Sequence, residues 1–174
     1  MSKVIIDNFI VDDDWALVTA ADTDPGHSLP SVKKIIVPLK IWQAKSIPLN
    51  GKTVGVSLDS ADDPGALEAD IKTLPLIAVN FATFKDGRGY STAYLLRTRY
   101  GYKGELRAIG DIQRDQLFYL HRVGFNAFAV REDKDIETAL KSLNDFSNVY
   151  QASVVQSSPL FRRRGAELGA ASGS

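Results

Sequence analysis

Past residue 50, the chain alternates short apolar runs with segments whose apolar residues recur at helical spacing. Four runs, beginning near residues 53, 76, 105 and 126, have the composition of buried strands. A segment with helical spacing follows each run. Strands joined by such short connections must pair in parallel, with right-handed crossovers. The pattern predicts an α/β protein whose mainly parallel sheet contains at least four consecutive βα units.

The expected strands of the sheet include one before the four units and cover residues 34–37, 53–58, 76–81, 105–109 and 126–130. In the first 20 residues, Asp12-Asp13-Asp14 stands between apolar runs, which predicts a small N-terminal antiparallel β-hairpin. Two architectures are compatible with this order, a half-barrel-like sheet and an open, doubly wound sheet. Both place a functional site at the carboxyl ends of the strands.

Four helices are expected between and after these strands. One begins at Asp63-Pro64, because aspartate is a preferred cap and proline suits the first helical position. Two more cover residues 91–99 and 114–122. The last has apolar side chains at i, i+3, i+4, i+7 and i+10, and Asp133 or Asp135 is placed to cap it.

Composition separates a core from peripheral segments. Residues 1–156 are predicted to form a single α/β domain, with the hairpin and a loop over 1–33 and the βα core over 34–156. Residues 157–174 have the small-residue composition of a loose, flexible tail. The cluster Arg162-Arg163-Arg164 in this tail either solubilises the chain or contacts an acidic surface.

The overall composition excludes several classes of function. The chain has 174 residues, with 21 Lys+Arg, 21 Asp+Glu and no cysteine. A net charge of zero argues against a bulk electrostatic grip on nucleic acid. Without cysteine there is no disulfide, thiolate-ligated cluster or thiol nucleophile. No window has the apolar length of a membrane span, and the N-terminus lacks the apolar core of a signal peptide, so we expect a cytoplasmic protein with no membrane partner.

The charge is unevenly distributed along the chain. Residues 85–122 carry 8 basic and 4 acidic side chains, a net charge of +4, whereas residues 1–72 have a net charge of −4. A basic segment in a neutral protein suits a small anionic ligand or an acidic partner. Alternatively, Arg97, Arg99 and Lys103 form a solvated helix end, where the helix dipole favours cations.

The longest loop at a strand carboxyl end is Asn80–Tyr90, with the sequence NFATFKDGRGY. Glycines on both sides of Arg88, the second of them Gly89, would let the backbone approach a ligand, and the helix that follows presents free N–H groups. The guanidinium of Arg88 suits a carboxylate, a phosphate or an oxyanion of sulfur. Alternatively, Arg88 pairs with Asp86 or Asp111 and holds the turn.

Other polar residues follow the remaining strands. Asp111 is a candidate general base or hydrogen-bond acceptor, with Asp115 one helical turn further on, although an aspartate there also suits an N-cap. Asp59, Asn80 and Arg131 follow the first, second and fourth strands of the βα units, so parallel topology predicts that they converge with Arg88 and Asp111 at one edge of the sheet.

Several cofactor sites are not indicated. The two histidines, His27 and His121, lack metal-ligand spacing to any partner, so no metal site is expected. The chain contains no Walker loop or dinucleotide fingerprint, and its residues identify no cofactor.

Residues 74–130 carry a long motif, LPLIAVNFATFKDGRGYSTAYLLRTRYGYKGELRAIGDIQRDQLFYLHRVGFNAFAV, and residues 146–151 read FSNVYQ. Both resemble DUF934, a bacterial family of unknown function whose members are labelled as oxidoreductases of sulfite reduction through gene association with sulfite reductase. The family has no established catalytic residues. The candidate residues that fall on its motif positions are Asp86, Arg88, Gly89, Tyr90, Arg107, Asp111 and Asp115.

The resemblance implies a role in assimilatory sulfite reduction, either as a small enzyme or as an accessory protein with sulfite reductase as its partner. Because the chain lacks cysteine, it cannot carry the siroheme-linked cluster itself. Two alternatives remain open. One is an enzyme or binding protein for a phosphorylated or carboxylated metabolite, and the other is a non-enzymatic docking partner that uses segment 85–122.

Overall fold

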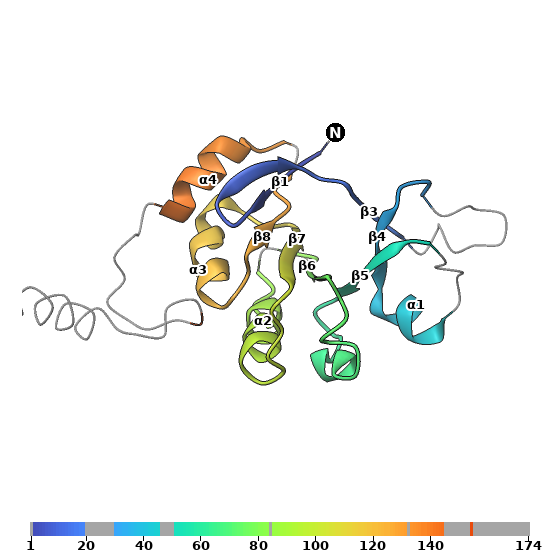
Figure 1. Ribbon diagram of the computed structural model, residues 1–174. Coiled ribbons are helices and arrows are strands. Elements are labelled where there is room, and N and C mark those ends of the chain that lie inside the picture. The colour runs from blue at the N-terminus through green and yellow to red at the C-terminus, as the bar shows by residue number, and fades with distance from the viewer. Residues whose placement is uncertain are drawn as a thin grey trace, which may run out of the picture.

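The computed structural model of the chain describes residues 2–19, 30–45, 51–83, 85–131, 133–144 and 154. Eight strands form one sheet in the order β2-β1-β8-β7-β6-β5-β4-β3 (Figure 1). Their bounds are β1 Lys3–Ile6, β2 Phe9–Asp12, β3 Trp15–Leu17, β4 Lys34–Pro38, β5 Thr53–Leu58, β6 Leu76–Phe81, β7 Glu105–Gly110 and β8 Ala127–Phe128. The mixed α/β class with a mostly parallel sheet is confirmed.

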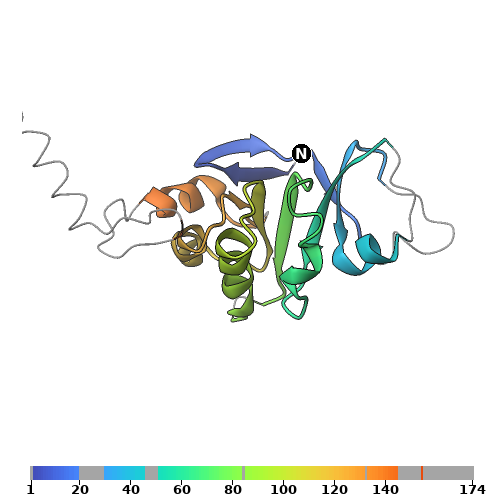
Figure 2. The same cartoon turned by 60° about the horizontal axis from the view of Figure 1, so that its bottom comes forward.

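The order of the strands decides between the two predicted architectures. Strands β3 to β8 lie side by side in chain order, and all five of their pairings are parallel. Since each crossover moves the chain in the same direction along the sheet, the helices gather on one face, as Figure 2 shows. The sheet is therefore a curled half-barrel rather than a doubly wound sheet.

The first and last strands of this order are joined by a very short connection. Only Asp13 and Asp14 separate β2 from β3, and three Cα–Cα steps reach at most about 11 Å. A flat sheet of eight strands would be roughly 34 Å wide. The sheet must therefore curl until one continuous run, residues 9–17, crosses from one edge to the other. We call this run the strap; Figure 1 shows it passing from the hairpin to β3.

The N-terminal hairpin is confirmed, but its turn lies elsewhere than predicted. Strands β1 and β2 pair antiparallel, with Ile6 opposite Phe9. Between them, Asp7 and Asn8 both have positive φ values, 48° and 67°, which is typical of a two-residue turn of type I′. Aspartate and asparagine tolerate this conformation better than most residues. The three aspartates Asp12-Asp13-Asp14 therefore lead into the strap instead of forming the turn.

Helices and 3₁₀ turns connect the strands and follow the last one. They are α1 Leu39–Ala44, η2 Pro64–Leu67, α2 Arg88–Thr98, η3 Arg114–Gln116, α3 Leu117–Arg122 and α4 Ile136–Asn144. Asp63 caps η2 by accepting a hydrogen bond from Gly65, as predicted. The segment after η2 continues as turns rather than as an α-helix, and it ends at Leu74, where the following Pro75 disfavours helical conformation. Of the two predicted caps for α4, Asp135 accepts the bond from the Glu137 amide.

The two faces of the sheet differ in what covers them. The helix-covered face contributes alternate residues such as Ile77, Val79 and Phe81 to the main core, and the inner face contributes Leu76 and Ala78 to a smaller cluster. Strand alternation thus places neighbouring residues of one strand in two separate environments. The predictions for His27, for the i+10 position of the last helix (Phe146), for Arg162-Arg163-Arg164 and for residues 157–174 lie outside the described residues.

Candidate functional site

The carboxyl ends of β5 to β8 bring together four of the predicted site residues. The Asn80 amide donates a hydrogen bond of 2.8 Å to Asp59 Oδ1. On its other side, Asn80 Oδ1 lies 2.6 Å from the position that a Cβ on Gly110 would occupy. The residue after Gly110, Asp111, forms an ion pair with Arg131, in which Arg131 Nη1 lies 3.1 Å from Asp111 Oδ1. These side chains form a row along one edge of the sheet, which we call the carboxyl edge.

Arg88 lies next to this row, but its guanidinium is engaged within its own loop. Its Nε and Nη2 donate to the two carboxylate oxygens of Asp86 at 3.0 and 2.8 Å, and its backbone N–H donates to Asp86 Oδ1 at 3.1 Å. Hydrogen bonds from Arg88 and from the Ser60 hydroxyl lower the pKa of Asp86 well below its usual range. The same pairing with Asp86 raises the pKa of Arg88. This geometry favours the interpretation that Arg88 holds the turn.

The neighbouring motif residues Gly89 and Tyr90 pack helix α2 onto β6. A Cβ on Gly89 would come within 2.5 Å of the Phe81 ring, so only glycine permits this close approach. Tyr90 stacks edge-to-face on Phe81, with ring centroids 5.8 Å apart. Burial raises the pKa of Tyr90, and its hydroxyl bonds to the Gln116 side chain. Both residues therefore have a packing role in the described structure.

Asp111 and Asp115 have different surroundings. The predicted capping role belongs to Gln113 rather than to Asp111, because Gln113 and Gln116 form a reciprocal capping box at the start of η3. Asp111 instead forms an ion pair with the guanidinium of Arg131, which also pairs with Asp133. These carboxylates raise the pKa of Arg131. Asp115 is exposed on η3, in the electrostatic vicinity of Tyr90.

Arg107 lies away from the carboxyl edge, on the inner face of the sheet. Its side chain is 2% exposed and pairs with Asp13 of the strap at 2.9 Å and with Glu105 at 2.7 Å. Its Nη2 is buried and has no hydrogen-bond partner among the protein atoms, and it is the one such side-chain atom in the described residues. The strap that pairs with Arg107 also encloses it, so a ligand would reach this guanidinium only if the strap moved.

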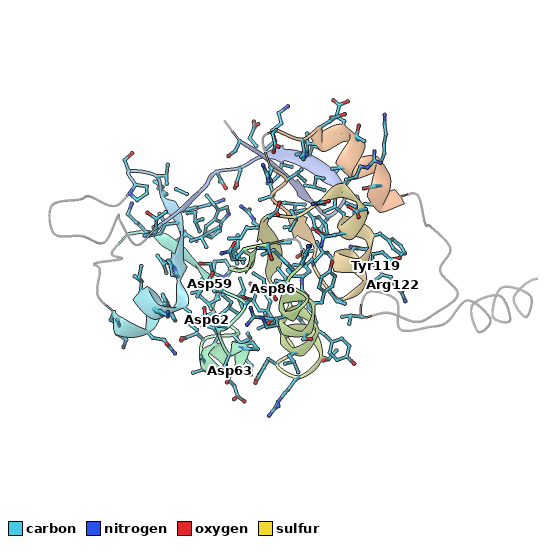
Figure 3. All side chains as sticks on the ribbon, turned by 180° about the vertical axis from the view of Figure 1, so that it is seen from behind. Asp59, Asp62, Asp63, Asp86, Tyr119 and Arg122 are labelled. Atoms are coloured by element: carbon cyan, nitrogen blue, oxygen red, sulfur yellow. The ribbon has the colours of Figure 1, made fainter. Side chains whose placement is uncertain are left out.

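The loop beside the carboxyl edge is acidic. Asp59, Asp62 and Asp63 accept hydrogen bonds from an amide side chain or backbone N–H groups, and none of the ion pairs in the described part of the chain includes them. Figure 3 shows these three aspartates following one another along the loop, with Asp86 near Asp59. Since Asp86 already neutralises Arg88, the local field disfavours an anion. Within the described ranges, no group of three or more His, Asp or Glu side chains is arranged to hold a metal ion.

The prediction of a solvated helix end is wrong for Arg97. Its guanidinium donates to the carbonyl oxygens of Tyr102, Gly104 and Gly124 at 2.7 to 3.0 Å, and to Asn126 Oδ1 at 3.1 Å. Burial lowers its pKa. Arg97 therefore ties α2 to the segment after α3, whereas Arg99 is exposed, as the prediction required.

Helices α2 and α3 lie side by side, with an outward face that sequence reasoning missed. Tyr90 of α2 bonds to Gln116 just before α3, and Arg97 near the end of α2 bonds to Gly124 just after α3. The two helices are thus linked at both ends, in agreement with Figures 1 and 2. Tyr94 and Tyr119, which lie midway along them, are 50% and 59% exposed.

None of the described helices has the length and apolar character needed to cross a membrane.

Comparison with known proteins gives one match, to the profile of a family. No curated protein and no solved structure gives a significant match to this chain. The profile of a bacterial protein family of unknown function, DUF934, matches residues 55–161, a range that begins within β5 and includes β6 to β8, the carboxyl edge, α2 and α3. The chain therefore belongs to the DUF934 family.

Proposed function

We propose that this protein is an accessory of assimilatory sulfite reduction that acts by docking to the reductase rather than by turning over a substrate. The observation that carries the proposal is which cations of segment 85–122 are paired within the chain and which are exposed and outside its ion pairs. Arg88, Arg97 and Arg107 are engaged by groups of the chain itself. Arg99, Lys103 and Arg114 are exposed and take part in none of the ion pairs of the described residues.

This distribution favours a macromolecular partner over a small anion. At the carboxyl edge, Arg88 and Arg131 are each matched by at least one carboxylate, and the neighbouring loop adds three more negative charges. A sulfite or phosphate ion would have to displace an internal partner there and would meet net negative charge. An acidic protein surface, in contrast, can meet the exposed cations of the outer helices without breaking any internal pair.

The resemblance to the family supports sulfite reduction as the process. The motif over residues 74–130 resembles proteins labelled for sulfite reduction, and the chain carries no cysteine with which to hold an iron–sulfur cluster of its own. An accessory role is compatible with both features. The reductase would then retain the redox cofactors, and the present chain would contribute a binding surface.

Two measurements test the proposal. A strain lacking this protein should fail to grow on sulfate or sulfite as sole sulfur source and should grow on sulfide. The affinity-tagged protein should co-purify with sulfite reductase from the same organism, and the purified chain alone should not consume sulfite with a supplied electron donor. Normal growth of the deletion strain on sulfite, together with no reductase in the purified fraction, would refute the proposal.

A further inference from the structure

The outward face of α2 and α3 combines exposed aromatic rings with arginines. Along the continuous helical run 114–122, residues three and four apart share one side. Phe118 and Tyr119 make an edge-to-face contact, with ring centroids 5.5 Å apart, and the Arg122 guanidinium lies 5.9 Å from the Phe118 ring. We call Tyr94, Phe118, Tyr119 and Arg122, with Arg99 and Arg114, the outer face.

This composition is typical of protein interfaces. Aromatic residues and arginine are the types most enriched at the centre of protein interfaces, because they bury a large area with few rotatable bonds. Tyr119 is 59% exposed. Figure 3 shows Tyr119 and Arg122 on the outer side of α3, away from the four labelled aspartates.

The charge of the outer face points to the kind of partner. Arg99 and Arg114 are exposed and Arg122 is half-buried, while Asp115 is the acidic side chain nearest in sequence on the same helical run. Asp115 lies four residues before Tyr119 and therefore on the same side of the run, so three arginines against one aspartate give this surface a net charge of +2, although the whole chain is neutral. The acidic loop of Asp59, Asp62 and Asp63 lies on a different part of the molecule (Figure 3). A partner surface rich in carboxylates would be attracted to the outer face and repelled by the acidic loop.

From these observations we infer that the outer face is the docking surface of this protein, and that its partner presents an acidic surface with a pocket for the Tyr119 ring. This inference rests on the proposed function only for the identity of the partner as the reductase. Tyr119 is the central anchor, and the positive charge of Arg99, Arg114 and Arg122 accelerates association.

The closing experiment uses the full-length protein in cells. A photoreactive benzoylphenylalanine replaces Tyr119 in one strain. In the control strain it replaces Phe9, an aromatic on β2 that is 72% exposed and so at least as accessible. After irradiation, the crosslinked partner is identified and the crosslinked peptide is mapped. We expect a crosslink from position 119 and not from position 9, to a partner segment with net negative charge.

Affinity measurements with the purified partner then test the individual residues. Tyr119→Ala is expected to weaken binding about 10- to 30-fold, as for an interface anchor. Arg122→Glu should lower the association rate and reduce its dependence on salt. The matched controls, Phe9→Ala and Lys40→Glu on α1, should bind as the wild type does, because both positions are exposed and lie outside the outer face.

The outcomes separate the two proposals. A crosslink to an acidic segment of sulfite reductase supports both of them. A crosslink to an acidic segment of another protein, with weakened binding of the Tyr119 and Arg122 variants, supports the docking surface and contradicts the role in sulfite reduction. If position 119 gives no specific crosslink, or both variants bind the partner as tightly as the wild type, the outer face is not the docking surface.

Discussion

The inner face and the carboxyl edge of the sheet both pair arginines with aspartates, yet the two settings differ in burial. On the inner face, Arg107 is 2% exposed, and its partners Asp13 and Glu105 are 12% and 19% exposed. At the carboxyl edge, Arg88 and Arg131 are 65% and 50% exposed, and their partners Asp86 and Asp111 are 13% and 30% exposed. The main difference therefore lies in the arginines, because water solvates the guanidinium groups at the edge but not the one on the inner face. Similar ion pairs therefore hold the fold in one region and only orient a loop in the other.

The largest expected effect is at Arg107. Replacing Arg107 with alanine leaves two mostly buried carboxylates without their cation and releases the strap from β7. We expect a loss of about 3–5 kcal/mol in the free energy of unfolding, the range for breaking a buried pair from one side. Urea denaturation measures it.

A triple variant sharpens this test. Combining Arg107→Met with Asp13→Leu and Glu105→Leu removes all three charges and should recover most of the lost stability, because no unpaired charge is left buried. If Arg107→Ala alone costs less than about 1 kcal/mol, the range of an exposed pair, the distinction between the two regions does not hold.

A second, smaller effect on stability is expected in the loop 80–90, where substitutions of Gly89 and Gly87 should differ. In Gly89→Ala the new methyl group meets the Phe81 ring, and overpacking of this kind costs roughly 1–3 kcal/mol. In the matched control, Gly87→Ala, a Cβ has no neighbour within 4 Å and φ is −75°, so stability should be unchanged. Thermal unfolding of both variants provides the measurement. Equal melting temperatures would show that α2 adjusts its position on β6.

The parallel core could be predicted from the sequence because its signal is local. Strands β5 and β6 have the predicted bounds, and β7 ends one residue later. Strand β8 is two residues long instead of five, and α1 was not predicted. The predicted residues at strand ends also meet as expected, since parallel topology alone brings Asn80 and Asp59 together.

The roles of individual charged residues were harder to predict, because they depend on contacts between distant segments. Arg107 pairs with Asp13, 94 positions away, and that contact exists only because the sheet curls until the strap crosses it. The predicted strand 105–109 places Arg107 among apolar residues, but nothing near it in the sequence identifies Asp13 as its partner. The surface around the exposed Tyr119 also depends on segments that are distant in the sequence. Its neighbours on the helix indicate an outward face, but only the fold shows that α2 extends this face.

The smallest expected effect is at Arg88, and it tests whether the carboxyl edge binds anions. In Arg88→Ala the melting temperature should stay nearly unchanged, because the Arg88 side chain is 65% exposed and Asp86 keeps its hydrogen bonds from the Ser60 hydroxyl and from the backbone N–H of residue 88. Since the pKa of Asp86 is depressed from 3.8, any stabilisation from the pair is present above that pH and is lost only on further acidification. Measurements between pH 5 and 8 are therefore free of this titration. Wild type and variant should show equal thermal shifts with sulfite, sulfate or phosphate. A shift seen with the wild type and lost in the variant would restore the anion-binding hypothesis for this loop, because it would mean that the guanidinium exchanges Asp86 for a ligand.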